Sequence, residues 1–297
     1  MTQVSASQVS SLKDTVGRYG IWSFGLRSED PEGLTERAEA AAELEELGFH
    51  ALWLGASPGV RHAAALVEAT SRLGVATGIQ SIWQYEATET ASAVAELEES
   101  HPGRFLLGLG VSHAGMADRY RRPYASMVEY LDALDAAGHP AERRVLAALG
   151  PKMLRLSRDR AAGSHPYLVT PEHTAQARAA LGETPLLAPE LKVVLDTDPD
   201  RARTTARGSL AMYLALPNYT NNFLRIGFTE DDIRDGGSDR LVDAVFAWGS
   251  EDRIRERVDA FHTAGADHVA LQVIEDQPRD GALPRDGWRR LAELLKP

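Results

Sequence analysis

The chain has 297 residues, of which 43% are hydrophobic and 25% are charged, so it can bury an ordinary globular core. The 32 Lys and Arg residues against 43 Asp and Glu give a formal net charge of −11 at pH 7, which argues against a general nucleic-acid binder. Cysteine is absent, which excludes a disulfide framework, thiol catalysis, iron–sulfur ligation and a cysteine zinc site.

The N-terminal segment 1–17 is polar and rich in serine, and we expect a flexible arm there, before a single domain over 18–297. The segment has no apolar core of signal-peptide length, and no stretch of the chain approaches about 18 uninterrupted apolar residues. We therefore expect a cytoplasmic protein that does not bind membranes.

Short apolar runs alternate with longer amphipathic stretches along the rest of the chain. Many of these stretches begin at a proline, which suits the first turn of a helix because its missing N–H would be unpaired there anyway. Runs that are apolar on both faces, each followed by a helix, predict parallel strands covered by helices. The eight runs are 18–24, 49–55, 74–80, 104–110, 143–150, 165–170, 191–197 and 267–273.

This alternation favours an α/β fold of the (β/α)8 type, a TIM barrel, over an open sheet. Successive runs lie about 20–40 residues apart until the last interval, which is roughly twice as long. The excess covers about 208–248, and we interpret it as a helical insertion between strands 7 and 8, near the barrel rim. Pro217, Asn218, Tyr219 and Asn222 suit a lid in this insertion and suit its outer surface equally well.

Four segments carry a family resemblance. ELEESHPGRFLLGLGVSHAG joins a helix end to a strand through HPGR and ends in a Gly-rich turn. Together with LEELGFHALWLG, GVATGIQSIW and ADHVALQV, it resembles the bacterial luciferase-like flavin-dependent monooxygenase superfamily, and within it the branch of coenzyme F420-dependent oxidoreductases. The resemblance covers about 18–295 and is weakest in the insertion.

The resemblance implies a homodimer in which the carboxyl ends of the barrel strands hold F420 or, alternatively, FMN. It also implies a non-proline cis peptide at the end of the third strand, where Gln80–Ser81 or its neighbour is the matching position. The residues expected to bind the cofactor are Trp22, Ser23, Gly55, Gln80, Ser81, Gly110, Ser112, Gly163, Ser164 and His165.

Several of these residues have a purely structural alternative. Trp22 is large enough to fill the barrel core instead of contacting a ring, and Gln80 with Ser81 suits a polar turn. Family members often bind the cofactor phosphate near the segment 162–164, whose backbone N–H groups and hydroxyl are suitable anion donors, but the same segment suits a plain turn. His165 precedes a proline and suits a cap of the sixth strand.

His113 follows the strand of the GLGVSHAG segment at the expected active face, and histidine is the side chain most easily protonated near neutral pH. We therefore expect His113 to be the catalytic residue, as proton donor or substrate contact; the alternative is a loop histidine bonded to backbone. Several F420-dependent dehydrogenases of the superfamily carry an acidic–histidine pair after the second strand, where this chain has Ala56 and Ser57. Histidine-assisted alcohol oxidation is therefore disfavoured relative to a reductase.

The sequence therefore predicts an oxidoreductase that transfers hydride between reduced F420 and an activated C=C, C=N or C=O group of a small organic substrate. One alternative is an FMN-dependent monooxygenase that uses O2 and a separate flavin reductase. Another is a non-catalytic luciferase-like partner subunit, since a fold does not establish a function. No metal site is expected, because the nine histidines form no HxH or HExxH pattern.

Overall fold

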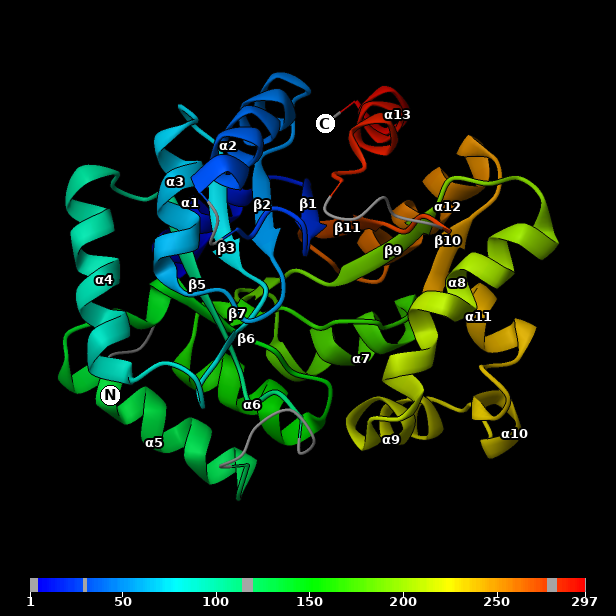
Figure 1. The fold of residues 1–297 in the computed structure, drawn as a ribbon. Coiled ribbons are helices and arrows are strands. Elements are labelled where there is room, and N and C mark those ends of the chain that lie inside the picture. The colour runs from blue at the N-terminus through cyan, green and yellow to red at the C-terminus, as the bar shows by residue number, and fades with distance from the viewer. Residues whose placement is uncertain (1–4, 29–30, 114–119, 277–281, 297) are drawn as a thin grey trace.

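The computed structural model describes residues 5–28, 31–113, 120–276 and 282–296. Parallel strands form the centre of the molecule and helices cover their outside (Figure 1). The strands are β1 (Tyr19–Ser23), β2 (Ala51–Leu54), β3 (Gly74–Thr77), β4 (Gln80–Ser81), β5 (Phe105–Gly110), β6 (Arg144–Leu146), β7 (Gly163–Ser164), β8 (Leu186–Leu187), β9 (Glu190–Val194), β10 (Phe246–Trp248) and β11 (Val269–Val273).

The helices begin largely where the sequence predicts, and prolines stand in the first turn of α5 to α9. They are α1 (Ala6–Val16), α2 (Pro31–Glu46), α3 (Val60–Glu68), α4 (Ala87–Ser100), α5 (Pro123–Ala136), α6 (Pro151–Arg160), α7 (Pro171–Leu181), α8 (Pro199–Leu214), α9 (Pro217–Arg225), α10 (Glu230–Ile233), α11 (Asp239–Val245), α12 (Glu251–Thr263) and α13 (Arg285–Leu295). Thr170 and Asp198 cap α7 and α8, since their side-chain oxygens accept hydrogen bonds from first-turn N–H groups.

The strands close into a barrel through the segment 186–194. Around the sheet the strands follow the order β10-β9-β11-β1-β2-β3-β5-β6-β7-β8, and every pair is parallel. β8 and β9 are consecutive pieces of one extended segment, in which β8 pairs with β7 and β9 pairs with β11. At the break between them, Ala188 N donates to Ser164 O and Ala270 N donates to Pro189 O, both at 3.0 Å. The predicted (β/α)8 barrel is therefore confirmed.

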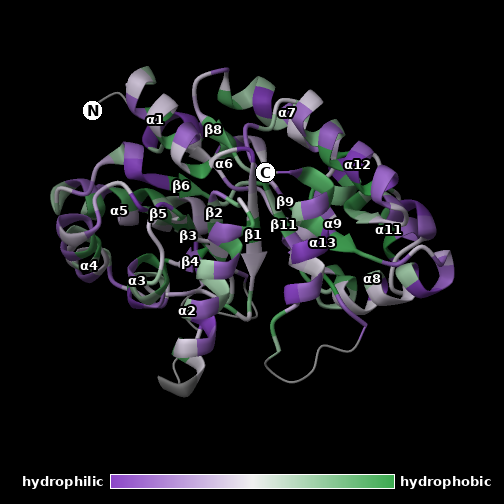
Figure 2. Ribbon diagram, turned by 90° about the horizontal axis from the view of Figure 1, so that it is seen from above, coloured by the Kyte–Doolittle hydropathy of each residue, from purple (hydrophilic) through white to green (hydrophobic). Residues whose placement is uncertain are grey.

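Strand details differ from the prediction at two places. The sixth strand, expected over 165–170, is instead Gly163–Ser164, because the apolar Leu168 packs with the insertion rather than in the sheet. The insertion is largely helical but also contains β10, which pairs with β9 outside the ring. Its helices lie together on one side of the barrel, where they build a hydrophobic cluster separate from the main core (Figures 1 and 2).

Within the predicted flexible arm 1–17, the described residues 6–16 are helical instead. Residues 6–16 form α1, whose Val9, Leu12 and Val16 are each 2% exposed. Leu12 and Val16 belong to the cluster inside the barrel, and Lys13 Nζ lies 2.9 Å from Asp267, just before β11. The polar residues that suggested an arm are the outer face of an amphipathic helix, which closes the amino-terminal end of the barrel.

Truncating Leu12 tests this role of α1. Leu12→Ala is expected to lower the free energy of unfolding by about 2–5 kcal/mol, because it opens a cavity among buried side chains. Urea unfolding followed by circular dichroism measures the change. Ser10→Ala, on the exposed face of the same helix, is the control and is expected to stay within about 0.5 kcal/mol of the parent. Equal free energies of unfolding for the two variants would contradict the packing of α1 and support a flexible arm.

Candidate active site

A cavity of about 570 Å³ opens at the carboxyl ends of the barrel strands. This size lies within the range of small-molecule and cofactor sites. Loops after the strands form one wall and the insertion helices form the other. The wall from the barrel includes Trp22, Gly78, Ile79, Ser81, Gly110, Ser112, His113, Ala147 and His165. The wall from the insertion includes Met212, Tyr213, Leu216, Asn218, Tyr219 and Arg225.

A glycine-lined surface lies on the barrel side of this cavity. The Gly78–Ile79 peptide after β3 is cis, earlier on the same strand end than the Gln80–Ser81 position that the resemblance implied. Trp22 Nε1 donates to Gly78 O at 3.1 Å. A Cβ at Gly78 would lie 2.7 Å from Trp22 Nε1, and one at Gly110 would lie 2.4 Å from Ile79 Cδ1. The absence of a side chain at these glycines therefore lets the backbone pack closely against the Trp22 indole and Ile79 along this wall.

Aromatic rings from barrel and insertion meet at the floor of the cavity. The Trp22 and Tyr167 ring centroids are 5.0 Å apart, and Tyr213 lies 5.5 Å from Tyr167 and 5.1 Å from Tyr219. Trp22 is only 3% exposed, so it belongs to the barrel core and to the cavity wall at once. Tyr219 lines the cavity, and its hydroxyl has no hydrogen-bond partner in the described part of the chain, which leaves it free for a ligand.

A buried ion pair lies beneath these rings. Lys192 Nζ donates to Glu190 Oε1 and Gln272 Oε1 at 2.9 Å and to the Tyr167 hydroxyl at 2.5 Å, so each of its three donors has an acceptor. The ammonium also lies 3.9 Å from the Tyr167 ring centroid. Burial lowers the pKa of Lys192 and raises the pKa of Glu190, while their mutual attraction opposes both shifts.

The direction of each hydrogen bond around Tyr167 follows from its partners. The Tyr167 hydroxyl accepts from Lys192 and donates to Gln272 Oε1 at 2.9 Å. The Tyr213 hydroxyl, 2.7 Å away, therefore donates to Tyr167. Burial raises the pKa of Tyr213, so this tyrosine stays protonated near neutral pH. The network fixes the floor of the cavity and leaves the Tyr213 oxygen able to accept a hydrogen bond from a ligand.

His165 offers a fixed acceptor to the cavity. Its Nδ1 lies 2.6 Å from Ala188 O, and because a carbonyl oxygen only accepts, Nδ1 carries the hydrogen. Nε2 is buried and has no partner among the described residues, while the side chain lines the cavity. Burial lowers the pKa of His165 to about 3, so the ring is neutral at pH 7, and it stacks on Trp53 with centroids 4.1 Å apart. Nε2 is therefore positioned to accept from an N–H or O–H group of a ligand.

His113 offers a donor instead. The Asn218 Nδ2 atom lies 3.5 Å from Ser112 O and 3.3 Å from His113 Nδ1. Because a carbonyl only accepts, Nδ2 faces both atoms and Nδ1 of His113 accepts, which leaves the ring hydrogen on Nε2. Burial lowers the pKa of His113, so the ring is neutral at pH 7. His113 is therefore a hydrogen-bond donor toward the cavity.

Several predicted residues do not reach the cavity. Gln80 is fully buried, and its Nε2 donates to Thr90 Oγ1 at 2.9 Å, so its side chain faces the helices outside the barrel. The Ser23 hydroxyl accepts from a backbone N–H two residues further on. Gly55 acts indirectly, because a Cβ there would lie 2.4 Å from the Trp22 ring. None of these three side chains is placed to touch a ligand in the cavity.

The predicted phosphate segment lies inside the sheet. A Cβ at Gly163 would lie 1.9 Å from Leu186 O, and the Ser164 hydroxyl donates to Leu146 O at 3.0 Å. Both residues are buried in β7, so their polar groups serve the barrel rather than a ligand. Of the predicted residues, those that line the cavity are Trp22, Ser81, Gly110, Ser112, His113 and His165.

The buried ion pair and most of the aromatic floor were not predicted from the sequence. Glu190 and Lys192 alternate with Leu191 and Val193 in β9, so both charged side chains point to the same face of a strand that is buried throughout. Two charged residues at this spacing inside an apolar run were the available signal. Tyr213 stands in α8 and gave no signal, because its place depends on how the insertion folds back over the barrel.

Among the described residues, no three His, Asp or Glu side chains gather in a group that would hold a metal ion. No helix in the described ranges is both long enough and apolar enough to cross a membrane.

Solved structures of similar fold bind both expected cofactors. An F420-dependent secondary alcohol dehydrogenase in complex with an F420–acetone adduct matches with a TM-score of 0.71 and 13% identity, over 94% of this chain and 98% of that one. Coenzyme F420-dependent tetrahydromethanopterin reductase from Methanopyrus kandleri matches with 0.68 and 14%, over 94% and 98%. The FMN complex of the oxygenating constituent of 3,6-diketocamphane monooxygenase from Pseudomonas putida matches with 0.65 and 15%, over 94% and 96%.

No curated protein sequence matches this chain. The family model for luciferase-like monooxygenases, in contrast, matches residues 18–268. This match covers most of the barrel and the insertion, and the resemblance seen in the sequence is thereby confirmed. The predicted enzyme class, a luciferase-like oxidoreductase, is confirmed with it, and the chain belongs to the luciferase-like monooxygenase family.

Proposed function

We propose that this protein is an F420-dependent oxidoreductase that transfers hydride between reduced F420 and an activated C=C, C=N or C=O group of a small organic substrate. The observation that carries the proposal is a cavity whose wall joins Trp22 and the Gly78–Ile79 peptide through a hydrogen bond and also includes His165, whose Nε2 has no partner among the described residues. A planar ring with N–H or O–H donors at its edge fits this combination of shape and hydrogen bonding.

Residues of the barrel wall would hold the cofactor. Trp22 and Gly110 would contact the ring, and His165 Nε2 would accept a hydrogen bond from it. When bound, F420 supplies the hydride chemistry, whereas the protein supplies placement and electrostatics. Ala56 and Ser57 stand where several F420-dependent dehydrogenases of the superfamily carry an acidic–histidine pair, and the reductive direction is therefore the one we propose.

The insertion wall would hold the substrate. The neutral His113 would donate its Nε2 hydrogen to a heteroatom of the substrate, and Asn218 keeps the ring in the required tautomer. The Tyr219 hydroxyl faces the same cavity and is free to donate a second hydrogen bond. Two donors on one substrate oxygen or nitrogen would polarise the double bond that receives the hydride.

FMN is the second candidate, since its ring system is also planar and one of the similar structures holds it. Titration of the purified protein with F420 and FMN separately, followed by calorimetry, decides between them. Saturable binding of F420 alone supports the proposal, and binding of FMN alone replaces it with an FMN-dependent monooxygenase. Binding of neither favours a non-catalytic partner subunit.

Trp22→Ala is expected to weaken cofactor binding about tenfold or more, because the loss of a buried aromatic contact costs roughly 1.5–3 kcal/mol. The cofactor titration measures the change. Ser23→Ala, at the next position in β1 but outside the cavity wall, is the matched control and is expected to bind as the parent does. Unchanged affinity in Trp22→Ala would remove the indole from the cofactor site.

We also propose, from the family resemblance, that the enzyme is a cytoplasmic homodimer. Analytical ultracentrifugation of the purified protein tests the dimer, and fractionation of cells that express it tests the location. A monomer at all concentrations would contradict the first proposal.

A further inference from the structure

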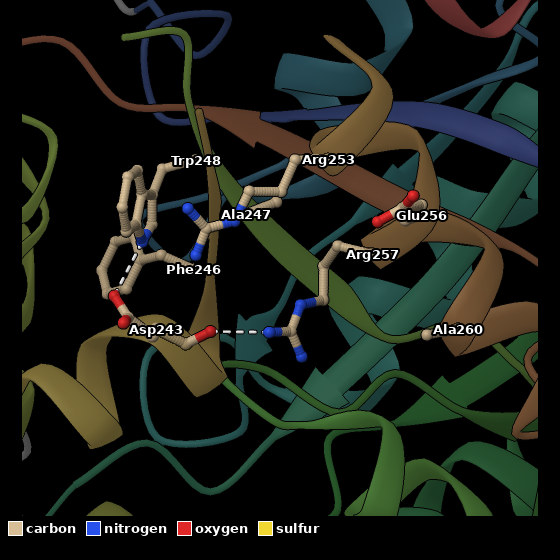
Figure 3. A pocket seen from close by; sticks show the side chains of 8 residues that line it. All are labelled: Asp243, Phe246, Ala247, Trp248, Arg253, Glu256, Arg257 and Ala260. Atoms are coloured by element: carbon tan, nitrogen blue, oxygen red, sulfur yellow. Dashed lines mark hydrogen bonds between the residues drawn. The ribbon is translucent and has the colours of Figure 1, made fainter. Parts of the chain in front are cut away.

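A second pocket, of about 240 Å³, lies beside β10, between α11 and α12 (Figure 3). It shares no lining residue with the cavity at the barrel mouth. Its walls are formed by Asp243 of α11, Trp248 of β10, and Arg253, Glu256 and Arg257 of α12. The pocket is therefore separate from the site proposed for the cofactor and has its own chemistry.

The two arginines present an unpaired double positive charge. Arg253 and Arg257 are four residues apart on α12, so they lie on the same face of the helix, and Figure 3 shows both guanidinium groups directed into the pocket. In the described part of the chain, no carboxylate lies within 4.0 Å of either group. Like charges at this spacing repel each other, so an anion between them would stabilise the arrangement.

The contacts that the arginines do make leave most of their donors unused. Arg253 lies over the Trp248 indole, 3.9 Å from its ring centroid. Arg257 Nη2 donates to the Asp243 backbone oxygen at 2.7 Å. These contacts fix where the guanidinium groups lie, but they satisfy a single N–H group of the ten that two arginines offer.

Nearby carboxylates are engaged elsewhere or directed to solvent. The Asp243 carboxylate accepts from Arg203 at 2.7 Å and from Trp248 Nε1 at 2.9 Å. Glu256 lines the pocket, and its side chain is exposed to solvent. Burial lowers the pKa of Arg257 and the charge of Arg253 lowers it further, whereas Glu172 and Asp243 raise it and compensate only in part for the burial of the charge.

We propose that this pocket binds the oxyanion of a small molecule, a phosphate or a carboxylate group, between the guanidinium groups of Arg253 and Arg257. Guanidinium groups form paired, charge-assisted hydrogen bonds with both kinds of anion. The shared chemistry is a planar or tetrahedral group with at least two acceptor oxygens. The site lies outside the barrel mouth, so occupation does not depend on the cofactor.

Calorimetric titration with inorganic phosphate and with glutarate, at constant ionic strength set by chloride, tests the proposal. We expect saturable binding of at least one probe. Tighter binding of phosphate assigns the site to phosphate esters, and tighter binding of glutarate assigns it to carboxylic acids. Arg253→Gln and Arg257→Gln are each expected to weaken binding by about tenfold, because each removes a charge-assisted contact.

Arg255→Gln is the matched control, because it removes the same charge from the same helix but from a side chain that pairs with Asp252. We expect it to bind as the parent does. Anion binding should also change the fluorescence of Trp248, since Arg253 covers its ring, and Trp248→Phe should abolish that signal. The absence of saturable binding by either probe, or an equal loss in Arg255→Gln, would overturn the proposal.

Discussion

Lys192→Met is expected to destabilise the fold by about 3–5 kcal/mol, because it leaves the carboxylate of Glu190 buried without its cation. Both side chains are fully buried, and their charged atoms are 2.9 Å apart. Methionine fills the space of the lysine stem but offers no donor to Glu190, Gln272 or Tyr167. The cost is therefore the uncompensated burial of charge and acceptors rather than a loss of volume.

A double-mutant cycle separates this effect from packing. Glu190→Gln alone leaves the ammonium buried without an anion, whereas the double variant with Lys192→Met removes both charges and is expected to cost less than the two single changes together. Urea unfolding of all variants provides the free energies. Lys152→Met, on the exposed face of α6, is the control and should change stability by less than about 0.5 kcal/mol. A similar small change in Lys192→Met would contradict the buried ion pair.

Stability is expected to fall steeply as the pH drops below about 6.5, the pKa of an unperturbed histidine. Burial lowers the pKa of His165 to about 3, and the pKa values of His139 and His268 to about 4. Between these limits the unfolded chain binds a proton on each imidazole and the folded chain does not. The free energy of unfolding therefore falls by about 1.4 kcal/mol for each histidine when the pH drops by one unit. The three histidines together give a slope of roughly 4 kcal/mol per pH unit.

Urea unfolding at a series of pH values between about 7 and 5 measures this slope, in a range where most carboxyl groups remain ionised. The pKa values of His113, His173 and His262 are also lowered, mainly by burial, and these residues steepen the fall. His139→Gln removes one of the three strongly shifted groups and is expected to reduce the slope. A free energy of unfolding that stays flat over this range would show that the buried histidines are protonated in the folded state.

The barrel was predictable because its strands are apolar on both faces and most of its helices begin at proline or at a capping residue. β7 and β8 were not predicted from apolar runs, because each strand contains only two residues and those of β7 are Gly163 and Ser164. In the apolar run that follows β7, Leu168 belongs to the core of the insertion and Val169 to the main core, tertiary contacts that no local pattern reveals. α1 was missed for a similar reason, because few of its residues are apolar and these pack against the distant barrel interior.

The candidate site was predictable in position but not in side-chain direction. Gln80 and Ser81 are neighbours in β4, and successive side chains of a strand point to opposite faces. Ser81 therefore lines the cavity, whereas Gln80 faces the outer helices. The sequence alone did not show which of the two would point inward. The sequence was consistent with Tyr219 in a lid or on the outer surface of the insertion. The structure places this residue in the cavity wall.

The insertion packs around its own cluster of buried side chains, which includes Leu210, Phe223 and Trp248, yet it supplies one wall of the cavity. Most of this cluster comes from the insertion, with Leu168 and Val194 added from the barrel, and it is separate from the main core. Changes in exposed or cavity-facing residues of the insertion are therefore expected to leave the main core of the barrel intact. Selection for a new reactant can therefore act on Met212 or Leu216 while the opposite wall keeps its geometry. The cavity therefore has one wall whose geometry is fixed by the barrel and a second wall, from the insertion, whose residues can change.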